Sequence, residues 1–127
     1  MFAFLFTAST GWIAVLLLAV ASVLPFLLRW LKSRGPGGMR AHYLLGFAIP
    51  ALAMMHASLV MPRMRGLDMT GIWFATIALV GLFVQMSLGI ELRAPPWGKP
   101  RGLRRWHLVM MLATSGFIAG HIALNRA

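Results

Sequence analysis

Four long apolar runs set the pattern of the chain, at about residues 4–30, 41–61, 69–92 and 103–124. Each run is close to the roughly 20 residues that an α-helix needs to cross a bilayer. Because the connections between the runs are short, consecutive helices must be antiparallel neighbours. The pattern predicts an all-α integral membrane protein, a four-helix up-down bundle that forms a single transmembrane domain over residues 1–127.

Small residues recur at helical spacing in the first and third predicted helices, where they let another backbone or a flat ligand come close. In the first helix they are Thr7, Gly11, Ala14, Ala21 and Pro25, and in the third they are Gly71, Ala75, Ala78 and Gly89. Gln85 also lies inside the third run. It needs a hydrogen-bond partner there, since hydrocarbon offers none.

The composition excludes an ordinary soluble domain. Hydrophobic residues make up 60% of the chain, charged residues only 11%, and the mean hydropathy is +0.81. The chain has no cysteine. Disulfides, thiolate metal sites, iron–sulfur clusters and thioether-attached haem are therefore excluded.

The formal net charge of +10 sits mainly in two connections. The first contains Arg29, Lys32, Arg34 and Arg40, and the third contains Arg93, Lys99, Arg101, Arg104 and Arg105. By the positive-inside rule these connections face the cytoplasm and both termini face outward. We therefore expect a bacterial inner-membrane protein with periplasmic termini, surrounded by lipid, and no nucleic-acid partner.

All four histidines belong to one repeated pattern. Arg40-x-His42 is followed after thirteen residues by His56, and Arg105-x-His107 is followed after thirteen residues by His121. Fourteen residues span about 21 Å along a helix. Fourteen steps of about 100° end roughly 40° short of four turns, so both rings leave nearly the same face. Each helix thus carries one imidazole near each membrane surface.

The two halves of the chain correspond to each other. The histidines match at an offset of 65 residues, and the first helix matches the third at an offset of 64, with Leu18/Leu82 and Arg29/Arg93 among the identities. A tandem repeat of two helical hairpins makes the second and fourth helices parallel. It places His42 and His107 at the inner level, with His56 and His121 at the outer level.

Four histidines at two matched depths favour metal coordination over packing. A single intramembrane histidine could bond a neighbouring helix, relay a proton or line a pathway. Paired imidazoles on facing helices can instead supply both axial ligands of a b-type haem. A metal transporter would gather its histidines around one site. The alternative that stays open is a pigment-binding subunit, in which each histidine is the single ligand of a chlorophyll-type ring.

At these residues the chain resembles the dihaem core of cytochrome b and cytochrome b6, and it is similar to ferric-reductase-like membrane domains. The resemblance implies that His42 with His107, and His56 with His121, ligate the iron of two haems b. It also implies glycines that face the haems, for which the candidates are Gly11, Gly46, Gly71, Gly116 and Gly120. The chain has no flavin or nicotinamide domain and no additional quinol-oxidation helices, so NADPH oxidation and quinol bifurcation are not expected of it.

Arginines near the helix ends are suited to the anionic haem propionates through charge-assisted hydrogen bonds. The candidates are Arg40, Arg104 and Arg105 for the inner haem and Arg63, Arg65 and Arg126 for the outer one. The only carboxylates, Asp68 outside and Glu91 inside, could handle protons, but they are more simply helix-end charges.

Iron with two protein ligands has no open position for substrate, so haems of this kind carry electrons. We therefore expect transmembrane electron transfer, with the chain acting as the cytochrome b subunit of a larger membrane oxidoreductase. Its partners would be other redox subunits or electron carriers, with quinone as one candidate.

Overall fold

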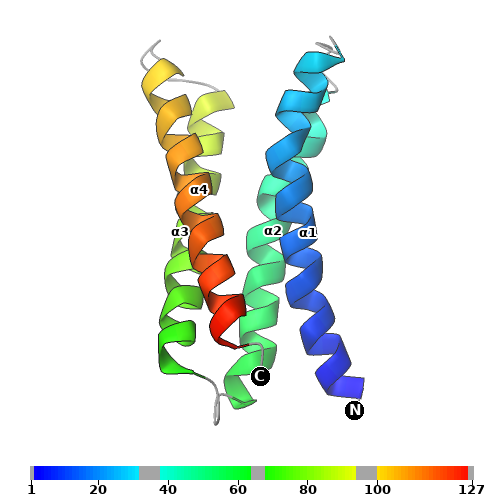
Figure 1. The fold of residues 1–127 in the computed structure, drawn as a ribbon. Helices are drawn as coiled ribbons and strands as arrows, with labels where there is room; N and C mark the ends of the chain where they lie inside the picture. The colour runs from blue at the N-terminus through cyan, green and yellow to red at the C-terminus, as the bar shows by residue number, and fades with distance from the viewer. Residues whose placement is uncertain (1, 32–37, 64–67, 94–99, 126–127) are drawn as a thin grey trace. The chain divides into compact units, whose positions relative to one another are not determined.

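Four long α-helices make up nearly all of the described chain. The computed structural model describes residues 2–31, 38–63, 68–93 and 100–125. The helices are α1 (Phe2–Trp30), α2 (Gly38–Val60), α3 (Met69–Arg93) and α4 (Pro100–Leu124), and a short 3-10 helix, η1 (Met61–Arg63), follows α2 (Figure 1). No strand occurs among the described residues. The predicted all-α fold class is confirmed.

Three helices begin two or three residues before the apolar runs that predicted them. The predicted starts were residues 4, 41 and 103, and the helices start at Phe2, Gly38 and Pro100. A run of apolar residues marks only the part of a helix that lies in hydrocarbon, while backbone hydrogen bonding continues into the polar interface. Proline suits the first position of α4, because its missing N–H would have no intrahelical partner there.

The helices have the length and composition of membrane spans. The spans are Ala8–Trp30, Met39–Val60, Met69–Arg93 and Arg101–Leu124. Most of their large apolar side chains are exposed, as expected for side chains that face lipid. Hydroxyl groups on these helices donate to the carbonyl four residues earlier, which satisfies them without water. They belong to Ser22, Ser58, Thr76 and Ser87, with distances of 2.8–3.0 Å. The chain is an integral membrane protein.

The chain divides into two compact units, residues 1–63 and 64–127. In the first, α1 packs against α2, and in the second, α3 packs against α4. Each pair is an antiparallel hairpin (Figure 1). In the first hairpin, for example, His42 contacts Ala21 and His56 contacts Thr10. The boundary between the units coincides with the boundary between the two hairpin repeats predicted from the sequence.

The seam between α1 and α2 is mostly apolar. Its buried residues include Ala14, Leu18 and Ala21 of α1 and Ile49 of α2. Ala14 and Ala21 belong to the predicted stripe of small residues, so this part of the stripe faces α2. Small side chains here let the two helices approach closely.

The seam between α3 and α4 combines polar and aromatic contacts. Thr114 is only 2% exposed and packs directly on Gly81. Nearby, Phe74 and Phe117 meet edge to face with ring centroids 5.6 Å apart, and Gly120 leaves room for the Phe74 ring. Within the described part of the chain, the buried atoms Thr114 Oγ1 and Gln85 Oε1 have no hydrogen-bond partner. The hydrogen-bond partner that the sequence predicts for Gln85 stays a prediction.

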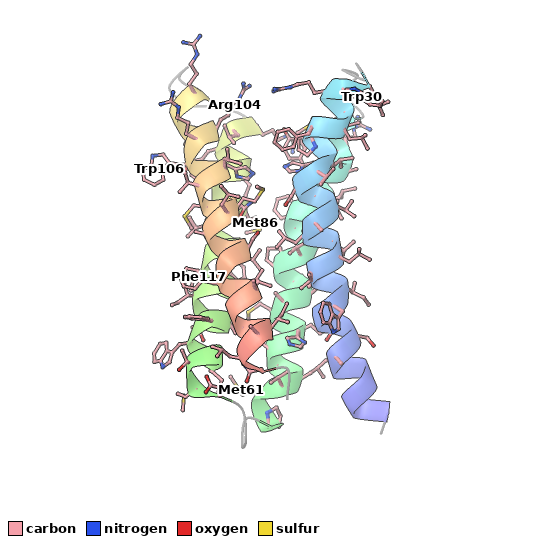
Figure 2. The ribbon with its side chains drawn as sticks, in the orientation of Figure 1. Trp30, Met61, Met86, Arg104, Trp106 and Phe117 are labelled. Atoms are coloured by element: carbon pink, nitrogen blue, oxygen red, sulfur yellow. The ribbon has the colours of Figure 1, made fainter. Side chains whose placement is uncertain are left out.

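Aromatic and cationic side chains mark the connection end of each hairpin. Trp30 is 78% exposed at the end of α1, and Trp106 is 63% exposed in the early part of α4. In Figure 2 the Trp106 ring points away from α3, and Arg104 lies two residues earlier on the same helix. Tryptophan and arginine at helix ends are typical of the membrane–water interface.

We expect Gly81→Ala to destabilise the second hairpin, because an added β-carbon would collide with Thr114 Oγ1. Overpacking of this kind costs about 1–3 kcal/mol, which would lower the melting temperature of the detergent-purified protein. Gly102→Ala is the matched control, since no atom lies within 4 Å of its added β-carbon. Equal melting temperatures for the two variants would contradict the close approach of α3 and α4 at Gly81.

Candidate functional site

All four histidines are half-buried at the seam of their own hairpin. The residues midway between them confirm which face this is. Ile49 lies seven residues from both His42 and His56 and is 3% exposed, while Thr114 lies seven residues from both His107 and His121 and is 2% exposed. Side chains at seven-residue spacing share a helix face. The common face predicted for each histidine pair is thus the face that packs against the first helix of the hairpin.

Two of the histidines bond a backbone carbonyl of the neighbouring helix. His42 Nδ1 lies 3.0 Å from the carbonyl oxygen of Ala21, and His121 Nδ1 lies 2.9 Å from that of Gly71. A carbonyl oxygen can only accept, so Nδ1 must carry the proton in both rings. In a neutral imidazole of this tautomer the lone pair is on Nε2, which is the nitrogen able to bind a metal.

The other two histidines meet α1 and α3 in different ways. His56 Nδ1 lies 3.3 Å from the hydroxyl oxygen of Thr10, and either group can be the donor. The same ring packs on Gly11, where an added β-carbon would lie 2.8 Å from His56 Cε1. His107 packs on Gly89, where the corresponding distance to its Cε1 is 3.6 Å. Each histidine therefore has a defined neighbour in the first helix of its own hairpin.

The predicted glycines divide into two groups. Three of them make room for side chains of their own hairpin: Gly11 for His56, Gly71 for Asn125 and Gly120 for Phe74. At Gly46 and Gly116 an added β-carbon would meet no described atom within 4 Å. A ligand could approach the backbone most closely at this second pair. Contact of any of the five glycines with a haem stays a prediction.

The three candidate arginines that the structure describes in full, Arg40, Arg104 and Arg105, lie at the helix ends where they were expected. Arg40 and Arg105 are exposed, and each stands two residues before a histidine, in the first turn of α2 and the second turn of α4. Arg104 is exposed beside Arg105. The side chain of Arg63, and the residues Arg65 and Arg126, lie outside the described part of the structure.

Sequence reasoning missed two residues that contact the histidines, Thr10 and Asn125. Asn125 follows His121 by four residues, and its side-chain amide donates to the His121 carbonyl oxygen at 3.2 Å. A polar residue one helical turn from a candidate ligand was the available signal. For Thr10 the signal was a hydroxyl residue next to a glycine in the predicted small-residue stripe.

Asp68 acts as the N-terminal cap of α3. Its Oδ1 accepts from the Gly71 N–H at 2.9 Å, and its carbonyl accepts from Ile72 N–H at 3.0 Å. Bonds of this kind satisfy N–H groups that have no partner inside the helix. The interpretation of Asp68 as a helix-end charge agrees with this role.

No group of three or more His, Asp or Glu side chains among the described residues is close enough to hold a metal ion. Each predicted ligand pair takes one histidine from each of the two units, so the pairing itself stays a prediction. Comparison of the chain with protein-family models, curated proteins and solved structures gives no match. The functional assignment therefore depends on the chemistry of the chain's own residues.

The hydrogen bonds to carbonyl oxygens predict that His42 and His121 carry their proton on Nδ1. Long-range ¹H–¹⁵N correlation spectra of the labelled protein in detergent distinguish the two neutral tautomers. We expect the Nδ1–H pattern for both rings. Observation of the Nε2–H tautomer at either position would contradict the arrangement.

Gly11→Ala should displace the His56 ring, because the new β-carbon would lie 2.8 Å from Cε1 and 3.1 Å from Nδ1. We expect changed ring chemical shifts for His56 and unchanged shifts for His42. Gly102→Ala, with no atom within 4 Å of the added carbon, is the control and should leave the chemical shifts of both rings unchanged. An unchanged His56 spectrum in Gly11→Ala would show that this contact is not tight.

Proposed function

We propose that this chain carries electrons across a membrane through two b-type haems, each held by two histidines. The ligand pairs are His42 with His107 near the connection ends of the hairpins and His56 with His121 near the opposite ends. The observation that carries the proposal is the Nδ1–H bond of His42 and His121 to a backbone carbonyl.

Metal-binding histidines usually donate their second ring N–H to a carbonyl, a carboxylate or water. This bond fixes the tautomer and the ring orientation, and it makes the other nitrogen a better ligand. His42 and His121 meet the condition without any carboxylate, which would be costly in hydrocarbon. The residues present therefore fit a group that takes imidazole Nε2 as its axial ligand.

Open space at two glycines of α2 and α4 also supports the proposal. Gly46 and Gly116 have open space around the position of a β-carbon, so a flat ring could approach the helix backbone there. Arg40 and Arg105 lie at the helix starts, close in sequence to His42 and His107. Their guanidinium groups suit the propionates of the haem nearer that end.

A haem with two histidine ligands supplies a one-electron iron couple with no open coordination position. The chain itself would hold the two groups at different depths and exclude water from them with its apolar helices. Because it carries no other redox chemistry that we recognise, we propose that it works as the cytochrome b subunit of a larger oxidoreductase. Electron exchange with quinone is consistent with this role.

The orientation follows from the charges. Six described arginines lie at the connection ends of the two hairpins, namely Arg29, Arg40, Arg93, Arg101, Arg104 and Arg105. By the positive-inside rule these ends face the cytoplasm, and both termini face the periplasm of a bacterial inner membrane.

The central test is a reduced-minus-oxidised absorption spectrum of the detergent-purified protein, with haem quantified per chain. We expect a low-spin b-type α band and two haems per chain. No bound tetrapyrrole after expression with added haem, or a chlorophyll-type spectrum, would overturn the proposal. The second of these outcomes would favour the pigment-binding alternative.

Histidine variants test the pairing. His42→Ala and His107→Ala should each lose the same haem. The variant that combines both substitutions should still contain the haem held by His56 and His121. His42→Ala combined with His121→Ala should lose both, because it removes one ligand from each pair. Ser58→Ala is the control, since this exposed hydroxyl two residues from His56 bonds only to the Met54 carbonyl of its own helix. It should retain both haems.

A further inference from the structure

A closed set of hydrogen bonds surrounds His121 at the end of the second hairpin opposite its connection. The Asp68 N–H donates to Asn125 Oδ1 at 3.1 Å, and Asn125 Nδ2 donates to the His121 carbonyl at 3.2 Å. His121 Nδ1 donates to the Gly71 carbonyl at 2.9 Å, and the Gly71 N–H donates to Asp68 Oδ1 at 2.9 Å. These bonds join the start of α3 to the last turn of α4 in a ring.

The side-chain amide of Asn125 connects the two helices directly. Its Oδ1 accepts from the Asp68 N–H before α3, and its Nδ2 donates to the His121 carbonyl of α4. Asn125 Nδ2 also lies 3.4 Å from His121 Nδ1. Since Nδ1 already donates to Gly71, both nitrogens are donors, and this contact is not a hydrogen bond. Asn125 therefore holds the His121 backbone through its carbonyl oxygen and does not bond the imidazole nitrogen.

Gly71 supplies the carbonyl oxygen that accepts from His121 Nδ1, and its lack of a side chain leaves space for the end of α4. A β-carbon at this position would collide with Asn125 Nδ2 and would lie 3.3 Å from Leu124 Cβ. The end of α4 can thus come close enough to α3 for the His121 ring to reach the Gly71 carbonyl. A larger residue would separate the two helices at this point.

The first hairpin carries different residues at the repeat positions of Asn125, Asp68 and Gly71. At the repeat offsets of 65 and 64, Val60 corresponds to Asn125, and Phe4 and Thr7 correspond to Asp68 and Gly71. His56 meets the Thr10 hydroxyl at 3.3 Å instead. The closed set of hydrogen bonds is therefore specific to the surroundings of His121 and is not a general feature of the repeat.

We propose that Asn125 is a positioning residue that keeps the His121 Nδ1–H against the Gly71 carbonyl and so makes its Nε2 a stronger iron ligand. The inference rests on the proposed function for its redox consequence. A hydrogen bond from the second ring nitrogen raises the basicity of the ligand. Greater basicity favours ferric iron, which lowers the midpoint potential of the haem that His121 holds.

The test uses the full chain with Asn125→Ala and Asn125→Asp. The first variant removes the whole link, while the second keeps the shape and Oδ1 but removes the Nδ2 donor. Hydrogen exchange of His121 Nδ1–H, measured by NMR on the reduced protein or on the protein without haem, should be about fivefold to tenfold faster in both variants. The His42 Nδ1–H should be unchanged.

Thr76→Ala is the control on the same hairpin, because its exposed hydroxyl bonds only to the Ile72 carbonyl of its own helix. Unchanged exchange of His121 Nδ1–H in both Asn125 variants would overturn the inference, whether or not the protein contains haem. Absence of haem from the wild-type protein would overturn the proposed function and leave the exchange result to decide the positioning role separately.

The second readout is the midpoint potential of the haem that His121→Ala removes. It should shift to a more positive value in Asn125→Ala, while the potential of the other haem stays the same. Faster exchange of His121 Nδ1–H without a shift in the midpoint potential would overturn the effect on the iron ligand. Asn125 would then only hold the ends of α3 and α4 together.

Discussion

A polar group in the hydrocarbon of a membrane must find its hydrogen-bond partner within the protein. This constraint explains most of the polar contacts in the described structure. Serine and threonine hydroxyls return to the carbonyl four residues earlier, as Ser22 and Ser58 do. The rings of His42 and His121 instead donate to a carbonyl of the neighbouring helix. The need to satisfy Nδ1 therefore ties each of these rings to a definite place.

The same constraint links packing to chemistry in each hairpin. The ring can reach the opposite carbonyl only where the two helices are close, and small residues at the seam provide that closeness. The carbonyl of Ala21 accepts from His42, and that of Gly71 accepts from His121. Because Nδ1 is used inside the hairpin, the metal-binding capacity of each ring resides in Nε2. A proposed haem ligand is thus prepared by contacts within a single hairpin.

The two hairpins share a pattern but differ in detail. Ile49 and Thr114 occupy corresponding positions midway between histidines, yet one is apolar and the other carries a buried hydroxyl. His56 meets a threonine hydroxyl, whereas His121 lies in a ring of bonds with Asn125 and Gly71. Such differences give the two halves of a repeat distinct polar environments, which is a common means of tuning metal ligands.

The sequence by itself determined the four membrane-length helices, the division into two hairpins and the histidine spacing, because apolar length and helical periodicity are local properties. It also indicated the stripe of small residues around Ala14 and Ala21. Only the tertiary structure decided what the small residues contact and which ring nitrogen carries the proton. Gly71 and Asn125 are distant from each other along the chain, and their contact depends on how α3 and α4 pack. Hydrogen-bond partners between helices are set by that packing at the level of single atoms, which no periodicity specifies.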